Sequence, residues 1–288
     1  MTVVYKKELR RLLGSWQAYT AMALMLLVCG VYVAFSNLLM GVADFSYPLV
    51  GSFLALIIAL PLLCEDLFVS ERKSGSNRMW YSLSFRPIDI VLGKYFAVLT
   101  VFLTVAAVLA FYPLLLSNFG ELLLAKAYFA WLGYVLLGTT LLALCTLISA
   151  FGSRRLIPFL VGVGALLLLW LLQRFVTKLP VAPVFSYLCI LLLLFGVAVF
   201  LWFVIGSRTA AVISLCLPVT ATVLFAICTK HFAALFSKLL ASVNPFSRYS
   251  GFIYGSFDLE GILFYLSVTV FFLLMTVLLL GYRRRDEL

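Results

Sequence analysis

Long uncharged, apolar stretches alternate with short polar segments along the whole chain. A helix needs about 20 apolar residues to cross a lipid bilayer, so each stretch is long enough, or nearly so, for one crossing. Backbone groups inside a bilayer must bond within their own segment, which favours helices; the alternating strands of about ten residues that form membrane barrels are not seen. The uncharged stretches lie at 12–43, 45–64, 95–120, 127–153, 156–173, 179–207, 209–229 and 261–282.

This pattern predicts an all-α, polytopic membrane helical bundle with about eight transmembrane helices. The second and fifth spans are the shortest, and they contain Pro61 and Pro158 respectively. Composition agrees, because 65% of the residues are hydrophobic and 11% are charged, against about 45–50% and about 25% in soluble domains. The predicted spans are 17–36, 49–64, 95–117, 128–150, 156–172, 184–206, 209–229 and 262–281.

Lysine and arginine are concentrated in alternate connections between the spans. The larger group falls on the side of the N-terminus, in segments such as 1–16, 65–94 and 283–285. Because basic residues are retained on the cytosolic side of membranes, both termini are predicted to be cytosolic. The formal net charge of +10 follows mostly from this bias, so nucleic acid is not an expected partner.

The sequence lacks the motifs that would give it chemistry of its own. It has no G-x-x-x-x-G-K-[ST] phosphate loop, no H-E-x-x-H or G-x-S-x-G motif, and no cluster of His, Cys and carboxylates at metal-ligand spacing. No charged residue falls in the middle of a predicted span, where secondary transporters usually place a coupling group. We therefore expect neither a catalytic residue nor a metal site, and the driving energy is expected to come from elsewhere.

Residues 1–16 mix apolar side chains with Lys6, Lys7, Arg10 and Arg11. This mixture predicts an amphipathic helix that lies on the inner leaflet, with its basic side toward the lipid headgroups. The alternative is a flexible basic anchor.

The longest predicted cytosolic connection, 65–94, contains a short helix of its own. Gly75 interrupts any helix that continues from the second span, and Ser76 can cap a new one. On that new helix Met79, Trp80 and Leu83 form one apolar face, which suits docking into a groove of a partner protein. The alternative is a helix half-sunk in the membrane interface and anchored there by Trp80.

Segment 230–261 is the longest predicted outer connection. Apolar residues at three- and four-residue steps predict an outer amphipathic helix, ended by Asn244-Pro245. An aromatic re-entrant or interfacial segment follows, and Asp258 is placed to cap the last span. The outer-face residues singled out are Phe246, Arg248, Tyr249, Tyr254 and Asp258, together with Phe252 and Phe257.

Three sequence elements follow one another along the chain: Glu71, Arg72, Lys73, Gly75 and Ser76, then Asp89, Val91, Leu92, Gly93 and Lys94, and finally 244–251 with Asp258, Leu259 and 263–267. In this order they resemble the ABC type-2 exporter permeases, and in particular their gliding-motility (GldF-type) branch. The resemblance covers roughly 1–172 and 240–285, and an extra pair of spans at 180–229 departs from the usual six. Glu65-Asp66 also stand where relatives often carry a basic residue.

The resemblance implies the permease subunit of a transporter in the bacterial cytoplasmic membrane. It would bind no cofactor directly, because ATP and Mg²⁺ belong to two cytosolic ATP-binding subunits. Those subunits would grip a coupling helix near 76–84. The other implied partners are a second copy or a related permease, membrane lipids and an extracytoplasmic auxiliary protein. Two alternatives stay open: a subunit that relays ATPase motion to an outer partner without transport, and an autonomous transporter or channel.

Overall fold

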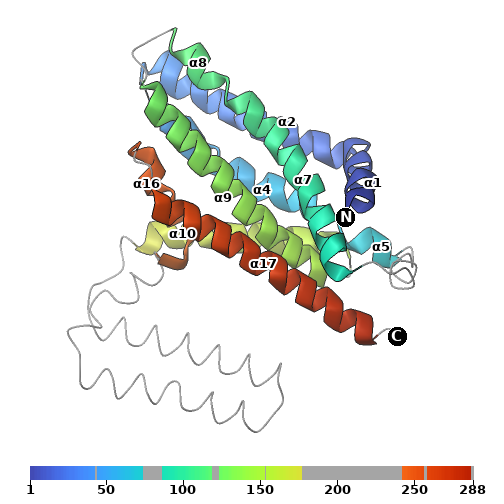
Figure 1. Ribbon diagram of the computed structural model, residues 1–288. Helices are drawn as coiled ribbons and strands as arrows, with labels where there is room; N and C mark the ends of the chain where they lie inside the picture. Colours follow the sequence, from blue (N-terminus) through green and yellow to red (C-terminus); the bar gives the residue numbers. More distant parts are fainter. Residues whose placement is uncertain are drawn as a thin grey trace, which may run out of the picture. The chain divides into compact units, whose positions relative to one another are not determined.

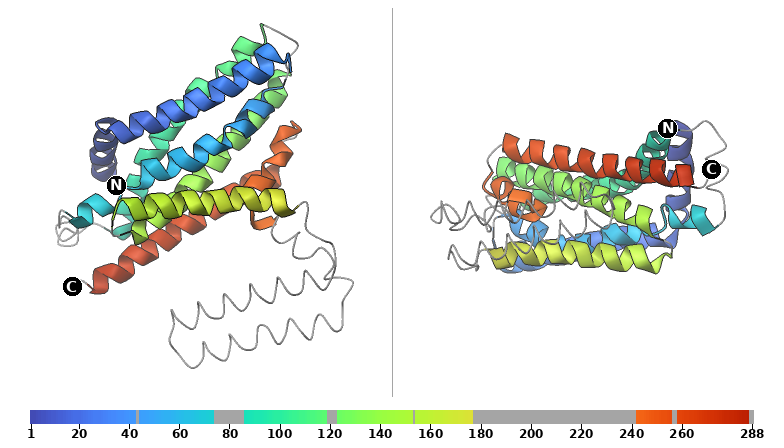
Figure 2. Two further views of the ribbon diagram at one scale, coloured as in Figure 1. Left: turned by 180° about the vertical axis from the view of Figure 1, so that it is seen from behind. Right: turned by 90° about the horizontal axis from the view of Figure 1, so that it is seen from below.

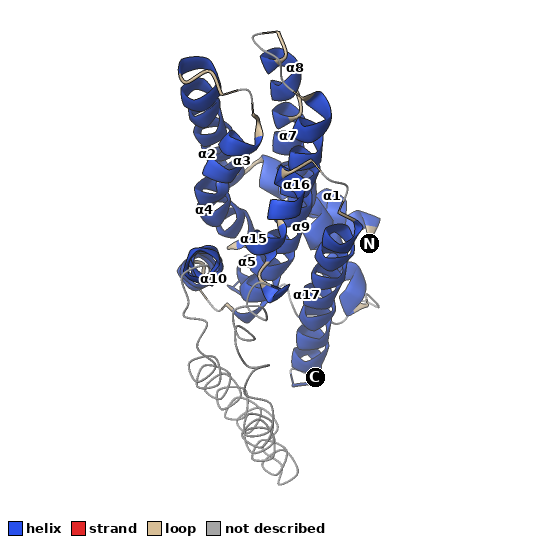
Figure 3. Cartoon of the chain, turned by 90° about the vertical axis from the view of Figure 1, so that its left-hand side faces the viewer, coloured by secondary structure: helices blue, strands red, loops and turns tan. Residues whose placement is uncertain are grey.

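The computed structural model describes residues 1–42, 44–73, 86–118, 123–152, 154–176, 242–255 and 258–286. Every regular element within these residues is helical (Figure 3). The chain divides into two compact units, Met1–Leu168 with Arg248–Leu288, and Leu169–Ser247. Each unit is described by itself.

The helices follow one another through short connections, as Figure 1 shows. The second helix ends in a π-helical stretch, η1. Their bounds are α1 Thr2–Leu13, α2 Trp16–Val33, η1 Ala34–Leu39, α3 Ser46–Gly51, α4 Phe53–Cys64, α5 Val69–Lys73, α7 Pro87–Leu109, α8 Tyr112–Leu116, α9 Leu124–Phe151, α10 Leu156–Val176, α15 Pro245–Arg248, α16 Ser250–Ile253 and α17 Leu259–Asp286.

Six helical stretches are long and apolar enough to cross a membrane, which confirms a multi-pass helical bundle for the described part of the chain. They coincide with six of the eight predicted spans. The other two predicted spans, 184–206 and 209–229, lie outside the described residues, as does most of the predicted outer amphipathic helix. The six stretches are Trp16–Leu39, Phe53–Glu71, Pro87–Leu116, Leu124–Phe151, Leu156–Arg174 and Leu259–Tyr282.

Helix α9 is the centre of the larger unit, because it packs against α4, α7, α16 and α17 (Figures 1 and 2). Its glycines allow aromatic rings to lie directly on its backbone. A Cβ at Gly138 would stand 2.1 Å from the Phe102 ring, and one at Gly133 would stand 2.6 Å from Phe252. Without a hydrophobic driving force between helices in lipid, such close packing is a main source of association.

Helix α1 forms as predicted but is partly buried rather than simply lying on a surface. The chain bends after α1, where the Ser15 hydroxyl caps α2 by accepting a hydrogen bond from the backbone N–H of Ala18 at 3.4 Å. One face of α1 packs along α7, with Val4 against Ile90 and against the bare backbone at Gly93. The helix is therefore fixed to the start of a spanning helix.

Candidate functional site

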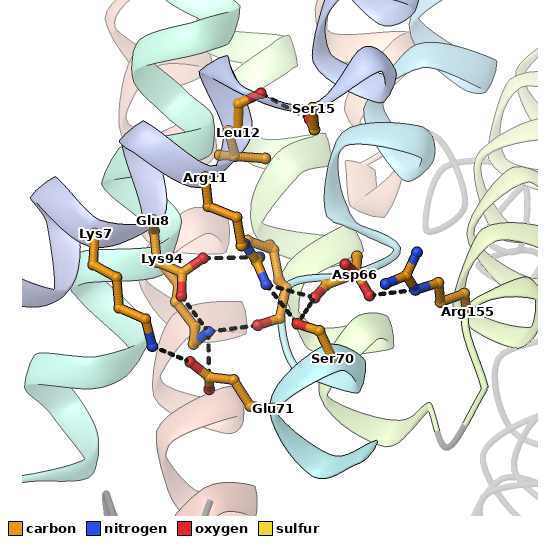
Figure 4. A network of polar contacts seen from close by, with 11 residues as sticks. Lys7, Glu8, Arg11, Leu12, Ser15, Asp66, Ser70, Glu71, Lys94 and Arg155 are labelled. Carbon is orange, nitrogen blue, oxygen red and sulfur yellow. Dashed lines mark hydrogen bonds and ion pairs between the residues drawn. The ribbon is translucent and has the colours of Figure 1, made fainter. Parts of the chain in front are cut away.

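A buried charged network lies where α1, α5 and the beginning of α7 meet (Figure 4). At its centre is Lys94, whose side chain is completely buried. The Lys94 ammonium nitrogen lies 3.0 Å from Oε1 of Glu8 and 3.1 Å from Oε2 of Glu71, and it also donates a hydrogen bond to the carbonyl of Leu67. One cation thus binds carboxylates from two other helices.

The buried ammonium group of Lys94 has several partners that replace its hydration. An ion removed from water costs several kcal/mol unless partners replace its hydration, by order of magnitude. Lys94 has two carboxylates and a carbonyl as partners, and its nitrogen lies 5.1 Å from the centre of the Phe68 ring, within cation–π range. Removing both carboxylates would leave the ammonium group buried without a counter-charge.

Two further basic residues of α1 support the same carboxylates. Lys7 pairs with Glu71 at 3.4 Å, and Arg11 pairs with Glu8 at 2.8 Å. Arg11 also donates hydrogen bonds to the hydroxyl of Ser70 and, at 3.3 Å, to the carbonyl of Asp66. Helix neighbours three and four positions apart share a face, so α1 presents these charges together toward α5.

The acidic pair Glu65-Asp66 also finds partners at this end of the unit. Asp66 pairs with Arg155 at 2.8 Å, which ties the end of the α4 span to the connection before α10. Glu65 accepts a hydrogen bond from the side-chain amide of Gln17 on α2. Both acidic side chains therefore have partners within this chain, the Arg155 charge for Asp66 and the Gln17 amide for Glu65.

The predicted ATPase-coupling residues are only partly described. Glu71, Arg72 and Lys73 belong to α5. Gly75, Ser76, Met79, Trp80 and Leu83 lie outside the described residues, so the short coupling helix stays a prediction.

Both flanks of the segment 74–85 reach α1. On one side Glu71 joins the network of Lys94, and on the other Asp89, in the first turn of α7, lies 3.7 Å from the N-terminal amine. Sequence reasoning noticed Lys94 only as part of a motif and did not single out Glu8. The available signal was that Glu8 is the one acidic residue in a basic helix.

A second set of charges lies at the opposite end of the spanning helices. Asp44 pairs with Lys126 at 2.6 Å and accepts hydrogen bonds from the backbone N–H of Ser46 at 3.0 Å and from its hydroxyl at 2.6 Å. Burial by itself would raise the pKa of Asp44, but the hydrogen bonds and the charge of Lys126 outweigh it and hold the pKa below its usual value. Asp44 is therefore a firmly ionised anchor for the loop before α3.

The outer-face residues differ from one another in burial and in partners. The buried Tyr249 hydroxyl donates a hydrogen bond to the carbonyl of Ala130 at 3.1 Å, while Tyr254 is 82% exposed. Arg248 pairs with Glu260 at 2.8 Å. Phe246 is buried, as is Asn244, whose side-chain Oδ1 accepts a hydrogen bond from the backbone N–H of Phe246 at the start of α15.

Asp258 caps the last spanning helix, as the sequence predicted. Its Oδ1 accepts a hydrogen bond from the N–H of Gly261 at 3.1 Å, and α17 begins at the next residue, Leu259. Its carboxylate also lies beside Gly251, where a Cβ would stand 2.6 Å from Oδ2. The cap thus fixes α16 to the beginning of α17.

Comparison of the chain with protein-family models, curated proteins and solved structures found no match. Among the described residues, no group of three or more His, Cys, Asp or Glu side chains is placed to hold a metal ion. The candidate site is therefore defined by its own geometry: a buried ionic network that joins α1, α5 and α7 on both sides of segment 74–85.

Proposed function

We propose that this chain is the membrane-spanning permease subunit of an ATP-binding-cassette transporter, working as an exporter. A separate cytosolic subunit hydrolyses ATP and grips the segment around Trp80. The six membrane-length helices and the motif resemblance support the proposal. The observation that carries it is the position of Lys94, which is bound to Glu8 and Glu71 at the base of that segment.

The network would transmit force from the gripped segment to the helices on either side of it. Segment 74–85 joins the α4–α5 span to α7, and the same buried ion pairs bind α5 and α7 to α1. Separating buried ion pairs is costly, so force applied to the segment would move these helices together rather than bend one of them. Because α7 contacts both α9 and α17, the movement would reach the core, as rigid-body rocking requires.

The distribution of charge supports an external energy source. In the described spans the charged residues lie near the ends, as Lys94, Lys126 and Glu260 illustrate. A transporter that couples to ions usually holds an ionisable group at mid-membrane. An ATP-driven partner supplies the energy instead.

The proposal is tested by purifying the full chain from its native membrane together with its ATP-binding subunit. We expect Trp80→Asp to reduce the amount of copurified ATPase at least about tenfold, because a charge replaces an apolar anchor at a hot spot of about 2 kcal/mol. Gly75→Pro should keep the ATPase bound but uncouple its hydrolysis from transport. The amount of bound ATPase is measured by quantifying the subunits of the purified complex, and its hydrolysis is measured as phosphate release.

The matched control is Tyr254→Asp, which makes the same chemical change at an exposed aromatic of the predicted outer face. It should retain the ATPase at the wild-type level. Normal copurification and normal hydrolysis with Trp80→Asp would refute the coupling role. ATP hydrolysis without release of solute from proteoliposomes would instead favour the relay function.

A further inference from the structure

The two faces of α1 differ in what they contact. The face toward α7 buries Val4, Glu8 and Leu12. The opposite face exposes Lys6 and Arg10 to the surroundings. Apolar side chains on and next to this free face are also exposed: Val3 by 65%, Leu13 by 45% and Trp16, just after the helix, by 71%.

The basic residues of α1 are divided between these faces. Lys7 and Arg11 pair with Glu71 and Glu8 in the buried network. Lys6 and Arg10, in contrast, form no ion pair with any residue that the structure describes. They are four positions apart and therefore lie one above the other on the helix. The only acidic residue of the helix, Glu8, is buried on the other side, so every charge on the free face is positive.

The position of α1 suits a membrane surface. The helix turns sharply away from the direction of α2, the first membrane-length helix, as both Figures 1 and 2 show. Only Gly14 and Ser15 separate α1 from α2. An exposed tryptophan beside a spanning helix is typical of the headgroup level of a bilayer, and exposed apolar residues beside cations are typical of helices that lie in that interface.

We propose that the free face of α1, formed by Val3, Lys6, Arg10 and Leu13 with Trp16 beside it, binds the headgroups of anionic phospholipids. The lipid phosphate lies between Lys6 and Arg10, and the guanidinium group can bind it through two parallel hydrogen bonds. Val3, Leu13 and Trp16 enter the region between the headgroups and the acyl chains. This site is independent of the transport proposal, since it requires neither ATP nor a partner protein.

The binding couples lipid composition to the buried network. Lys6 and Arg10 face the lipid, while their neighbours Lys7 and Arg11 hold Glu71 and Glu8. A helix held at the membrane surface keeps those inner residues in register with Lys94. Anionic lipid therefore stabilises α1 in its place against α7.

The test measures hydrogen exchange of the full chain in two kinds of nanodisc, one of pure phosphatidylcholine and one in which about one lipid in three is phosphatidylglycerol. A single lysine or arginine near an anionic membrane surface strengthens binding to that surface about fivefold. We expect the amides of α1 to exchange at least about fivefold more slowly in the anionic discs. The double substitution Lys6→Gln/Arg10→Gln should abolish this difference, because both charges that meet the phosphate are gone.

The matched control is Arg154→Gln, an exposed arginine outside α1 in the sequence that forms no ion pair with a described residue. It should keep the lipid effect. As a second readout, native mass spectrometry counts the phosphatidylglycerol molecules that each purified variant retains. Equal exchange of α1 in both lipids, or equal lipid retention by the double variant, would overturn the proposal. Protection that arises only when a cytosolic protein is added would assign the face to that protein instead.

Discussion

At the scale of single residues, substitution of Lys94 is expected to have the largest effect on the stability of the fold. Its ammonium group is completely buried between Glu8 and Glu71. Lys94→Met keeps much of the side-chain volume but leaves Glu8 and Glu71 with only the partly exposed Arg11 and Lys7 as cationic partners. We expect the free energy of unfolding in detergent to fall by about 3–5 kcal/mol, the range for breaking a buried ion pair. Chemical unfolding followed by circular dichroism measures this loss.

Two comparisons make that prediction specific. Lys126→Met breaks the partly exposed pair with Asp44 and should cost only about 1 kcal/mol or less. Adding Glu8→Gln and Glu71→Gln to Lys94→Met removes the buried negative charges and should restore part of the stability. Equal losses for Lys94→Met and Lys126→Met would show that burial of the network contributes nothing.

Asp44 provides a residue-scale prediction on pH. Its pKa is held below the ordinary value of 3.8 by Lys126 and Ser46 against the opposing effect of burial. A lowered pKa in the folded state stabilises the fold fully above the unfolded-state pKa, and this contribution is lost as the pH falls through the lower folded-state value. Wild type should therefore exceed Asp44→Asn in thermal stability by a constant amount from pH 7 to about pH 5, and the gap should close below about pH 4. A gap that widens on acidification would contradict the assignment.

At the scale of elements, the close packing of α7 on α9 depends on Gly138. A methyl group there would overlap the ring of the buried Phe102, which also packs against the ring of Tyr134. Gly138→Ala should lower the free energy of unfolding by about 1–3 kcal/mol through overpacking. Gly164→Ala in α10 is the control, because nothing lies within 4 Å of the added carbon, and it should be neutral or add up to about 1 kcal/mol by helix propensity. A stabilising Gly138→Ala would contradict the packing.

The elements themselves could be predicted from the sequence, while their ionic contacts could not. Uncharged runs of about 20 residues have one structural solution in a bilayer, and the helix-capping role of Asp258 is a local effect of the neighbouring residues. The pairing of Lys94 with Glu8 joins positions 86 apart in the chain, and no local pattern specifies such a contact. The sequence also suggested that all the basic residues of the N-terminal helix meet lipid. The structure uses Lys7 and Arg11 internally, because α1 packs on α7.

At the scale of the whole molecule, the described charges of the larger unit gather at two ends and leave an uncharged middle. One end holds the network around Lys94 and also both chain termini (Figure 1). The other end holds the pairs Asp44–Lys126 and Arg248–Glu260. This arrangement suits a machine that is driven from one side of the membrane and opens on the other.

The most direct test places a photo-crosslinking amino acid at position 80 of the full chain in its native membrane, with the same group at position 254 as the control. We predict that position 80 crosslinks to a protein that binds ATP on the cytosolic side, and that position 254 does not. Crosslinking of position 80 to lipid alone, or to an extracytoplasmic protein, would contradict the central claim that an ATPase drives this chain through segment 74–85.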